Sequence, residues 1–447
     1  MSLGGEFMSY TINEVLEFVK ENDVKFIKLA FCDLLGTQKN ISIMASELEG
    51  AFYEGISFDA SSIKGYSDVS KSDLLLFPDL DTLSVLPWRP QQGRVIRFFC
   101  NIKTPEKEVA PCDAREILRG VVDKYFKLGY SPKIGTECEF YLFKTDENGE
   151  PTKETHDKGT YFDIAPIDKG ENIRREICLC LEEMDIMPET SHHEHGPGQN
   201  EIDFYYSGAI TAADNFLTFK SVVKSIAARN GLFASFMPKP LSYESGNGLH
   251  VNLSLTKGGL NIFGEQANSN TYSEEVNSFI AGILSKTKEI TAFLNPTINS
   301  YERFGKFEAP KYISWSYQNR SQLIRIPAAT GENNRMELRS PDSSINPYLA
   351  FSLILSAGLY GIENSLKLPD SVDKNLYTLS EEELKEIEKI PHTLEEAIKI
   401  AQNSEFVKEV LGEELLNKYI ELKECEIREY NNSIDKDRLM NLYFEYI

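Results

Sequence analysis

The order of strand-like and helix-like segments most constrains the fold of this 447-residue chain. Beyond residue 107, long helical segments and well-separated strand segments follow one another without a regular strand–helix–strand alternation. Strands not joined by regular helical crossovers pair mostly antiparallel, so the sequence predicts an α+β domain with a mostly antiparallel sheet. Helices are predicted at Ala114–Leu128, Asn172–Met184, Ala212–Asn230, Glu274–Leu294, Pro347–Leu366 and Glu413–Asn431. Strands are predicted at Lys133–Lys144, Glu201–Tyr206, Leu249–Leu255, Leu323–Ile326 and Arg335–Ser340.

A smaller group of elements precedes this domain. Thr11 followed three residues later by Glu14 is a capping-box pattern, which predicts a helix over Thr11–Asn22. Short strands are predicted at Val24–Asp33, Ile41–Met44, Leu74–Phe77 and Val95–Ile102, and a charged linker at Thr104–Pro111. We therefore expect a small domain over residues 8–107, a large domain over residues 108–447, and a tag-like leader at residues 1–7.

Composition excludes several classes of protein. The formal charge is −22, from 47 basic and 69 acidic residues, whereas nucleic acids and anionic membranes attract basic surfaces. The seven cysteines form no C-x-x-C pair, so they indicate neither a disulfide framework nor a cysteine-based zinc module. No secretory signal pattern opens the chain, and the apolar segment Pro347–Ile362 is too short and interrupted to span a bilayer. We expect a cytoplasmic protein that binds neither nucleic acid nor membrane.

Carboxylates at strand spacing form the first candidate site. Glu137 and Glu139 lie two apart on a predicted strand, so both point to one face, about 6.5–7 Å apart along it. That spacing suits one ligand on each of two metal ions about 3.5–4 Å apart. Glu194 and Glu201 offer further oxygen ligands for a hard cation. The alternative for each is a glutamate on a solvated surface.

Histidines accompany these carboxylates, but they do not form a zinc signature. The spacing of His192, His193 and His195 fits no standard zinc pattern, and adjacent residues of a strand point to opposite faces. His250 shares one strand face with Asn252 and Ser254, and either binds a ligand or has a structural role. The glycines that precede this strand, Gly246 and Gly248, allow a ligand to approach the backbone closely.

Arginines gather in the C-terminal third of the chain. Guanidinium groups suit phosphate and carboxylate oxygens, although surface ion pairing remains the alternative for any one of them. The set consists of Arg303, Arg320, Arg325, Arg335 and Arg339, and Glu337 shares a face with Arg339. The chain contains neither a G-x-x-x-x-G-K-[ST] loop nor a G-x-G-x-x-G motif. Metal ions and arginines, rather than a P-loop, would therefore have to hold a nucleotide's phosphates.

The motifs, in this order, resemble those of type I glutamine synthetases from about Tyr10 to the C-terminus. The segments that carry the resemblance are F-D-A-S-S-I at 58–63, E-C-E-F at 137–140, K-G-T-Y-F at 158–162, S-H-H-E at 191–194, G-Q-N-E-I-D at 198–203, M-P-K-P at 237–240, G-L-H-V-N-L-S at 248–254, N-R-S at 319–321, R-I-P at 325–327 and N-P-Y-L-A at 346–350. The resemblance implies a small N-terminal β-grasp-like domain and a large catalytic domain. It also implies a dodecamer of two stacked six-membered rings, with active sites between subunits.

The resemblance further implies a reaction: ATP-dependent amidation of L-glutamate by ammonia through γ-glutamyl phosphate, in nitrogen assimilation. Two Mg²⁺ or Mn²⁺ ions would act in each site, one held by Glu139, Glu194 and Glu201 and the other by Glu137, His250 and Glu337. A nitrogen-regulatory protein is a further implied partner, at the helical C-terminus from Glu413 to Ile447.

Other site residues take their roles from the same resemblance. Asp59 of a neighbouring subunit and Tyr161 would form the ammonium site, and Glu308 would lie on a flap over the intermediate. The phosphoryl group and glutamate would contact Arg320, Arg325, Arg339, Arg303 and the Gly246 backbone, and the nucleotide would lie near Ser254, Asn252 and Arg335.

The chain departs from the family pattern at several positions. Ser245 replaces an asparagine that helps to hold the glutamate amino group, and the flap from Asn299 to Glu308 is one residue shorter. The chain lacks the insertion of the adenylylated subdivision of the family and resembles its shorter alpha subdivision. Asp68 stands where that subdivision carries an arginine involved in feedback inhibition by glutamine. Two alternatives remain: a γ-glutamyl ligase acting on an amine or polyamine, and a non-catalytic scaffold. The presence of Asp59 and Tyr161 favours ammonia, and the six metal ligands favour catalysis.

Overall fold

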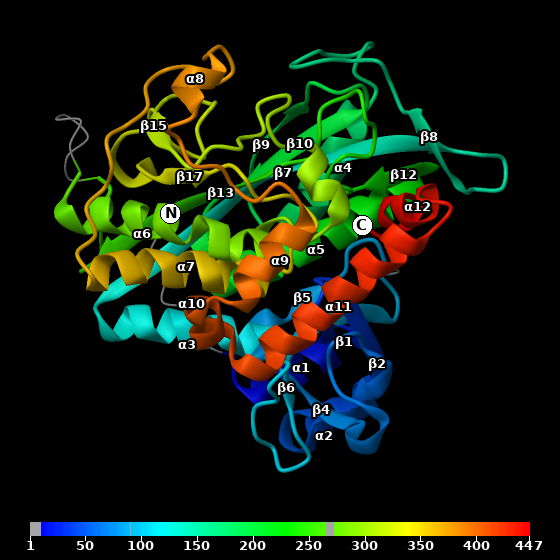
Figure 1. Cartoon of the computed structure of the whole chain (residues 1–447). Helices are drawn as coiled ribbons and strands as arrows, with labels where there is room; N and C mark the ends of the chain where they lie inside the picture. Colours follow the sequence, from blue (N-terminus) through cyan, green and yellow to red (C-terminus); the bar gives the residue numbers. More distant parts are fainter. Residues whose placement is uncertain (1–9, 90, 265–271) are drawn as a thin grey trace. The chain divides into compact units, whose positions relative to one another are not determined.

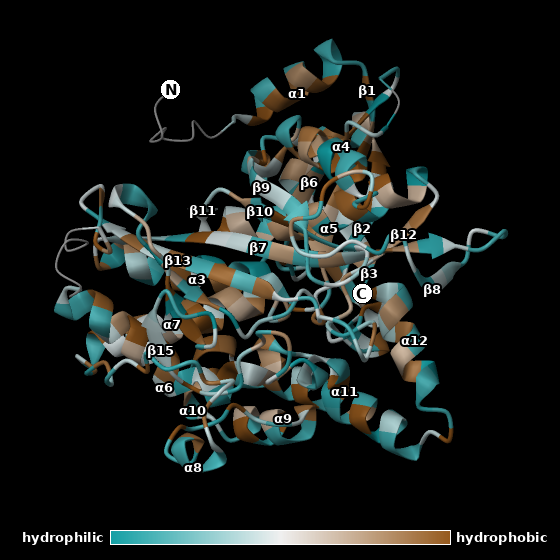
Figure 2. Cartoon of the chain, turned by 90° about the horizontal axis from the view of Figure 1, so that it is seen from above, coloured by the Kyte–Doolittle hydropathy of each residue, from teal (hydrophilic) through white to brown (hydrophobic). Residues whose placement is uncertain are grey.

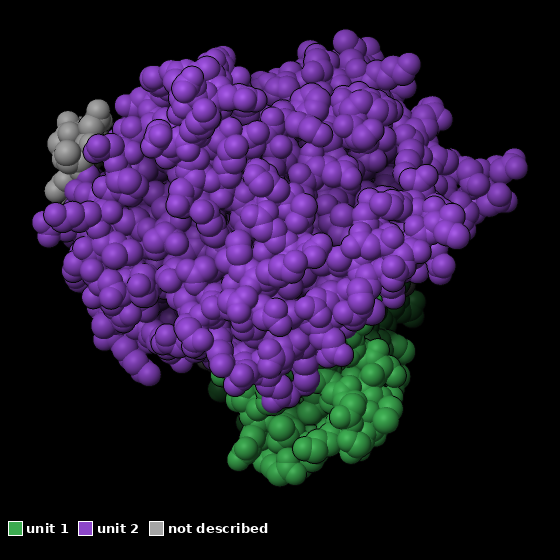
Figure 3. All heavy atoms as spheres, in the orientation of Figure 1, with its two compact units in different colours: residues 1–116, 182–185 green, residues 117–181, 186–447 purple. Residues whose placement is uncertain are grey.

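The computed structural model describes residues 10–89, 91–264 and 272–447, so the tag-like residues 1–7 lie outside the described part. The chain divides into two compact units, coloured separately in Figure 3. One unit contains the described residues up to Glu116 together with Glu182–Asp185. The other contains the described residues of Ile117–Leu181 and Ile186–Ile447.

The first unit is built on a six-stranded sheet of order β2-β1-β6-β4-β3, with β5 paired to β6. Its elements are α1 (Ile12–Glu21), β1 (Val24–Cys32), β2 (Gln38–Met44), α2 (Leu48–Glu54), β3 (Ile56–Asp59), β4 (Asp73–Pro78), β5 (Ser84–Val85) and β6 (Arg94–Lys103). The parallel pairing of β1 with β6 brings the first and last long strands together. The predicted capping box is present at Thr11 and Glu14, and α1 contributes Val15 to the same core as Leu76 and Phe98.

The second unit is built on an eleven-stranded sheet with the main order β15-β16-β17-β13-β7-β10-β9. All pairs are antiparallel except β15 with β16, which confirms the prediction of a mostly antiparallel sheet. Its strands are β7 (Tyr130–Thr145), β8 (Pro151–Thr155), β9 (Pro188–His193), β10 (Gln199–Phe204), β11 (Ser207–Gly208), β12 (Leu232–Ser235), β13 (Leu249–Lys257), β14 (Leu260–Asn261), β15 (Trp315–Tyr317), β16 (Ile324–Ile326) and β17 (Met336–Leu338).

A layer of helices covers one face of this sheet. In the part of the chain that the structure describes, the remaining α-helices are α3 (Ala114–Lys127), α4 (Glu171–Glu182), α5 (Ala209–Arg229), α6 (Glu274–Leu294), α7 (Pro347–Glu363), α8 (Glu381–Leu384), α9 (Leu394–Gln402), α10 (Glu405–Leu411), α11 (Glu413–Asn432) and α12 (Asp437–Tyr446). Figure 1 shows α5, α6 and α7 running along the sheet. Phe140 of β7 contacts Phe219 of α5, with ring centroids 5.9 Å apart. Since side chains alternate along a strand, Glu137 and Glu139 point away from α5.

The helix α11 is amphipathic. Figure 2 shows alternating hydrophilic and hydrophobic bands along α11, whose Leu416, Tyr419 and Ile420 are buried. Within the described residues, no helix combines the length and the apolar character needed to cross a bilayer.

The inner helices α6 and α7 cross at glycines. A methyl group added at Gly282 would lie 2.2 Å from the carbonyl oxygen of Ala357, and one at Gly361 would lie 1.9 Å from that of Ser278. Both distances are far below van der Waals contact. Glycine at these two positions therefore allows the helix backbones to touch.

Candidate active site

A cavity of about 890 Å³ lies in the second unit, and polar residues of the sheet and of neighbouring loops make up most of its lining. Antiparallel pairing assembles these residues from segments far apart in the sequence. The pairs that face each other across neighbouring strands are Glu137–His250, Glu139–Glu201, Asn252–Glu337 and Arg325–Glu337. The carboxylate, histidine and arginine segments of the sequence thus meet on one sheet.

Glu137, His250 and Glu337 form one group of potential metal ligands, with ligand atoms within 4.8 Å of one another. His250 Nδ1 lies 3.0 Å from Glu137 Oε2 and 3.5 Å from Glu337 Oε1. Asn252 Nδ2 donates to Glu137 Oε1 at 3.0 Å. Burial acts to raise the pKa of Glu137, but His250 and Asn252 outweigh it and lower the pKa to about 2. Glu137 is therefore an ionised potential ligand at neutral pH.

Glu201 lies at the centre of a second group. It forms one set of ligand atoms with Glu139 and His250, and another with Glu194 and His192. Glu139 and Glu194 therefore each approach Glu201, but they do not share one set with it. His192 was not predicted as a site residue, yet its Nε2 lies 3.2 Å from Glu201 Oε1. The S-H-H-E segment carried the signal, since only one of two adjacent histidines can face the cavity.

This second group carries more negative charge than its protein neighbours compensate. Burial and the Glu194 carboxylate raise the pKa of Glu139, and burial and the neighbouring carboxylates raise the pKa of Glu201 well above its usual value. Asp203 lines the same cavity, and burial and Glu137 raise its pKa to about 7. Its Oδ1 is buried without a hydrogen-bond partner. Carboxylate and imidazole groups in such surplus match the donor set of a divalent cation.

Gln199 is another residue that the sequence analysis missed. Its Nε2 donates to Glu139 Oε2 at 2.9 Å and to the Gly246 carbonyl at 3.1 Å. It therefore joins the carboxylate group to the loop before β13. The amide was visible in the G-Q-N-E-I-D segment, but no periodic pattern marks such a bridge.

Two arginines form ion pairs with Glu337. Arg325 Nη1 lies 2.5 Å from Glu337 Oε2, and Arg339 Nη1 lies 2.5 Å from Glu337 Oε1. Burial acts to raise the pKa of Glu337, but Arg339 outweighs it and the pKa falls below its usual value. The Nε atoms of both arginines are buried without a partner. Both guanidinium groups line the cavity and keep donors for a further anion.

The other three arginines lie around the same cavity. Arg303 is buried and donates from Nη1 to the Ser340 carbonyl at 3.2 Å. Arg335 donates from Nε to Asn252 Oδ1 at 2.9 Å, and Arg320 is exposed at the cavity wall. The cavity therefore combines a cluster of carboxylates with the guanidinium groups of five arginines.

Glycine and serine positions frame the cavity near β13. A methyl group on Gly246 would lie 2.6 Å from Arg303 Cγ, so the backbone lies directly against this arginine. Ser245 also lines the cavity, and its carbonyl accepts from Tyr141 Oη at 2.7 Å. Ser254 is buried on the same face of β13 as Asn252, but it is not among the residues that line the cavity.

The flap and Tyr161 close two further sides. Phe307 and Glu308 adopt left-handed backbone conformations, with φ of 47° and 66°, and Glu308 Oε2 lies 3.9 Å from Arg339 Nη2. Tyr161 stacks on His195 with ring centroids 4.5 Å apart. Both predicted residues therefore line the cavity.

Asp59 lies in the first unit, at the end of β3. Its Oδ1 accepts from the Ser61 amide at 2.9 Å, and the hydrogen bonds of Ser61 lower its pKa. Among the described residues, all those that line the cavity belong to the second unit. Asp59 is thus an exposed, ionised carboxylate of the first unit.

Comparison with known families decides the assignment. The model for the glutamine synthetase catalytic domain matches residues 111–442, and the model for the glutamine synthetase beta-grasp domain matches residues 23–105. The chain belongs to the glutamine synthetase family. Members of this family join ammonia to glutamate at the expense of ATP and use divalent metal ions, and the chain is a glutamate–ammonia ligase of this kind.

Full-length relatives agree with this family membership. Glutamine synthetase of Clostridium saccharobutylicum is 46% identical over 440 residues, which cover 98% of this chain and 99% of the relative. Glutamine synthetase of Methanosarcina mazei is 46% identical over 423 residues, which cover 94% and 95%. Staphylococcus aureus glutamine synthetase is 43% identical over 442 residues, which cover 97% and 99%.

Solved structures share the fold of this glutamine synthetase family member. A GmaS–ADP complex has a TM-score of 0.86 at 29% identity, with coverage of 96% of this chain and 99% of that chain. Plasmodium falciparum glutamine synthetase has a TM-score of 0.85 at 27% identity, with coverage of 97% and 99%. The β-grasp unit followed by a large catalytic unit, expected from the sequence, is therefore confirmed.

Proposed function

We propose that the cavity is the glutamine-forming site and that it works with two divalent cations, Mg²⁺ or Mn²⁺. The observation that carries this proposal is the surplus of buried carboxylates beside an arc of arginines. Glu139, Glu194 and Glu201 would hold one ion, and Glu137, His250 and Glu337 the other. Bound cations would neutralise charge on the phosphate and carboxylate oxygens during phosphoryl transfer.

The arginines would handle the anions. Arg303 and the Gly246 backbone would bind glutamate, and Arg325 and Arg339 would contact the transferring phosphoryl group and the substrate. Arg320 would stabilise the charge that develops on the phosphoryl group. The supporting features are the unpartnered Nε atoms of Arg303, Arg325 and Arg339, since these donors face no protein acceptor.

The nucleotide would lie beside Asn252, Ser254 and Arg335. Arg335 lines the cavity, and its hydrogen bond to Asn252 supports a fixed position for this guanidinium group. ATP is needed because oxide is a poor leaving group, and phosphorylation converts the glutamate side chain into a reactive acyl phosphate. Glu308 would close the flap over this intermediate and exclude water.

Ammonium requires a carboxylate that binds it and removes its proton, because only neutral ammonia is nucleophilic. Asp59 of a neighbouring subunit would do this, together with Tyr161. The low pKa of Asp59 supports an ionised carboxylate, and its exposure leaves it accessible to another subunit. We therefore include in the proposal an obligate dodecamer of two stacked hexameric rings.

Cellular context completes the proposal. We place the reaction in the cytoplasm, in nitrogen assimilation, and the seven cysteines, all free thiols in the structure, support a reducing compartment. A nitrogen-regulatory protein would dock on residues 413–447, where α11 presents a largely exposed charged face.

Phosphate release by the assembled protein tests the proposal. With ATP, Mg²⁺ and glutamate, ammonium should support turnover, whereas ethylamine and putrescine should not. Asp59→Asn keeps the cap on Ser61 but removes the base, and it should lower ammonium-dependent turnover at least about a hundredfold. Asp23→Asn, at another exposed aspartate of the first unit, is the matched control and should retain full turnover.

Two results would contradict it. Turnover with an amine but little with ammonium would assign a γ-glutamyl ligase. No turnover with any nitrogen source, in an intact assembly, would assign a non-catalytic scaffold.

A further inference from the structure

A closed polar cluster lies behind the cavity wall, centred on Asp157, Asp168 and His193. All three are buried, and their ligand-type atoms lie within 4.8 Å of one another. His193 follows His192 on β9, so its ring points away from the cavity that His192 lines. The proposed reaction does not use any of the three residues.

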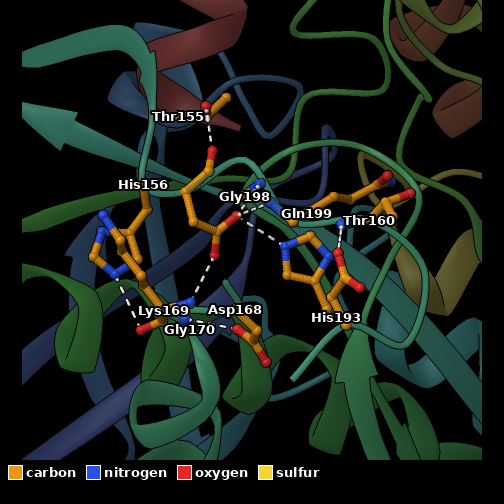
Figure 4. A network of polar contacts seen from close by, with 12 residues as sticks. Thr155, His156, Thr160, Asp168, Lys169, Gly170, His193, Gly198 and Gln199 are labelled. Carbon is orange, nitrogen blue, oxygen red and sulfur yellow. Dashed lines mark hydrogen bonds and ion pairs between the residues drawn. The ribbon is translucent and has the colours of Figure 1, made fainter. Parts of the chain in front are cut away.

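The Asp157 carboxylate joins three separate segments. Its Oδ1 accepts from the Gly159 amide at 3.1 Å, the Gly198 amide at 2.8 Å and His193 Nε2 at 2.9 Å, and its Oδ2 accepts from the Lys169 amide at 3.0 Å. Figure 4 labels His193, Gly198 and Lys169, three of the residues whose nitrogen atoms lie within hydrogen-bond distance of Asp157. It therefore ties the loop over residues 156–170 to β9 and to the turn before β10.

His193 connects the Asp157 carboxylate to residues at the cavity wall. Its Nδ1 lies 2.7 Å from the Glu194 carbonyl, and its own carbonyl accepts from the Phe162 amide at 3.1 Å. A carbonyl and a carboxylate can only accept, so both ring nitrogens donate. A methyl group on Gly159 would lie 2.6 Å from His193 Nε2, so the loop packs directly on the ring.

The cluster needs no metal ion to balance its charge. Arg174 Nη2 lies 2.6 Å from Asp168 Oδ2, and the Gly170 amide donates to Asp168 Oδ1 at 2.8 Å. Arg174 Nη1 also donates to Asn200 Oδ1 at 2.6 Å. Each carboxylate oxygen of the pair thus already accepts at least one hydrogen bond.

Two of the three segments that Asp157 joins carry proposed site residues. The loop carries Tyr161, and the turn after β9 carries Glu194, whose carboxylate accepts from the His195 amide at 2.9 Å. Tyr161 and His195 stack, and Thr160 Oγ1 donates to the His195 carbonyl at 3.3 Å. A shift between the loop and the turn would therefore move the ammonium-binding ring relative to a metal-binding carboxylate.

We propose that Asp157 is a positioning residue that, through His193, fixes Tyr161 and Glu194 in the relative geometry needed for ammonium binding. The inference rests on the proposed function of these two residues. A displacement of about 1 Å in such an arrangement can cost about a hundredfold in rate, so four hydrogen bonds at one carboxylate are a strong constraint.

Asp157→Asn tests the proposal. The amide would present a donor either to the Lys169 amide or to the three donors at Oδ1, which loosens the tie without changing side-chain size. We expect the KM for ammonium to rise about tenfold while the KM for ATP stays within about twofold. Isothermal titration of the assembled protein with Mn²⁺ alone should show one class of sites weakened about tenfold, as for other residues that orient metal ligands.

Asp146→Asn is the matched control. This exposed aspartate also accepts two backbone amides, from Asn148 at 2.8 Å and Glu150 at 2.9 Å, but in the turn between β7 and β8. It should leave both KM values and Mn²⁺ binding unchanged. His193→Gln, which removes the ring but keeps one donor, is the second variant if Asp157→Asn does not assemble.

The outcomes separate the two proposals. Unchanged ammonium KM and Mn²⁺ binding in Asp157→Asn would overturn the positioning role. If both KM values rise together and the melting temperature falls, the positioning role is also overturned, in favour of a general folding role. If the unaltered protein shows no ammonium-dependent turnover, the proposed function fails, and the Mn²⁺ titration still decides the role of Asp157.

Discussion

Two buried clusters of carboxylates and histidines lie within one unit, and they differ in how their charges are satisfied. Around Asp157 and Asp168, backbone amides, His193 and Arg174 supply donors to the carboxylate oxygens. Around Glu139 and Glu201, carboxylates face other carboxylates, and burial raises their pKa values.

The comparison teaches how to distinguish a structural cluster from a functional one when residue types are the same. Burial acts to raise the pKa of Asp157, but the hydrogen bonds of His193 and of the Lys169 amide lower it far below its usual value. Such a group stabilises the fold, whereas a buried carboxylate with a raised pKa destabilises it until a cation arrives. The unsatisfied cluster is therefore the one to which we assign cation binding.

The largest expected effect is on the unsatisfied cluster. Glu201→Gln should lower turnover about a thousandfold, because it removes a carboxylate shared by two groups of potential ligands. The same change should raise the melting temperature of the metal-free protein, since it relieves repulsion with Glu139 and Asp203. Calorimetry in a chelator, alongside the turnover assay, checks both effects. A fall in melting temperature would mean that Glu201 is also structural.

The satisfied cluster should respond in the opposite sense. Asp168→Ala leaves the buried Arg174 guanidinium without its carboxylate, which should destabilise the protein by about 3 kcal/mol. Urea unfolding of the metal-free protein measures this loss. Asp163→Ala, which removes an acceptor for the Thr160 amide only, is the control and should cost far less. Equal losses in the two variants would remove the distinction between the clusters.

The smallest expected effect is a pH dependence of opposite sign in the two clusters. The raised pKa of Asp203, about 7, means that the folded protein binds more protons than the unfolded chain between about pH 4 and 7. As the pH rises through that window, the melting temperature of the metal-free protein should therefore fall by a few degrees, and Mg²⁺ should abolish this fall. Asp203→Asn should flatten the slope. The contribution of Asp157, whose pKa is lowered, is instead lost as the pH falls below about 4.

The periodic parts of this molecule were predictable from the sequence. The predicted helix Glu274–Leu294 coincides with α6, because its buried residues recur on every turn. The shared face of Glu137 and Glu139 followed from strand alternation alone. The opposite directions of His192 and His193 followed from the same rule.

The non-periodic parts were not predictable. The strand β9 is polar along most of its length, so its pairing with β10 left no hydrophobic pattern. The register that places Glu201 opposite Glu139 pairs β10 with β7, two strands that no short turn connects, so no turn motif in the sequence marks it. The role of Asp157 depends on backbone amides, which every residue except proline carries, and no residue pattern can mark them.

The crossing of α6 and α7 at Gly282 and Gly361 has a mechanical consequence. Backbones that touch at a notch cannot slide along each other, because a shift of one turn would drive a side chain into the neighbouring carbonyl groups. The two helices therefore resist sliding past each other and form a rigid support under the sheet. Motions of the catalytic unit should be confined to its loops, while the strands that carry the ligands move as one body.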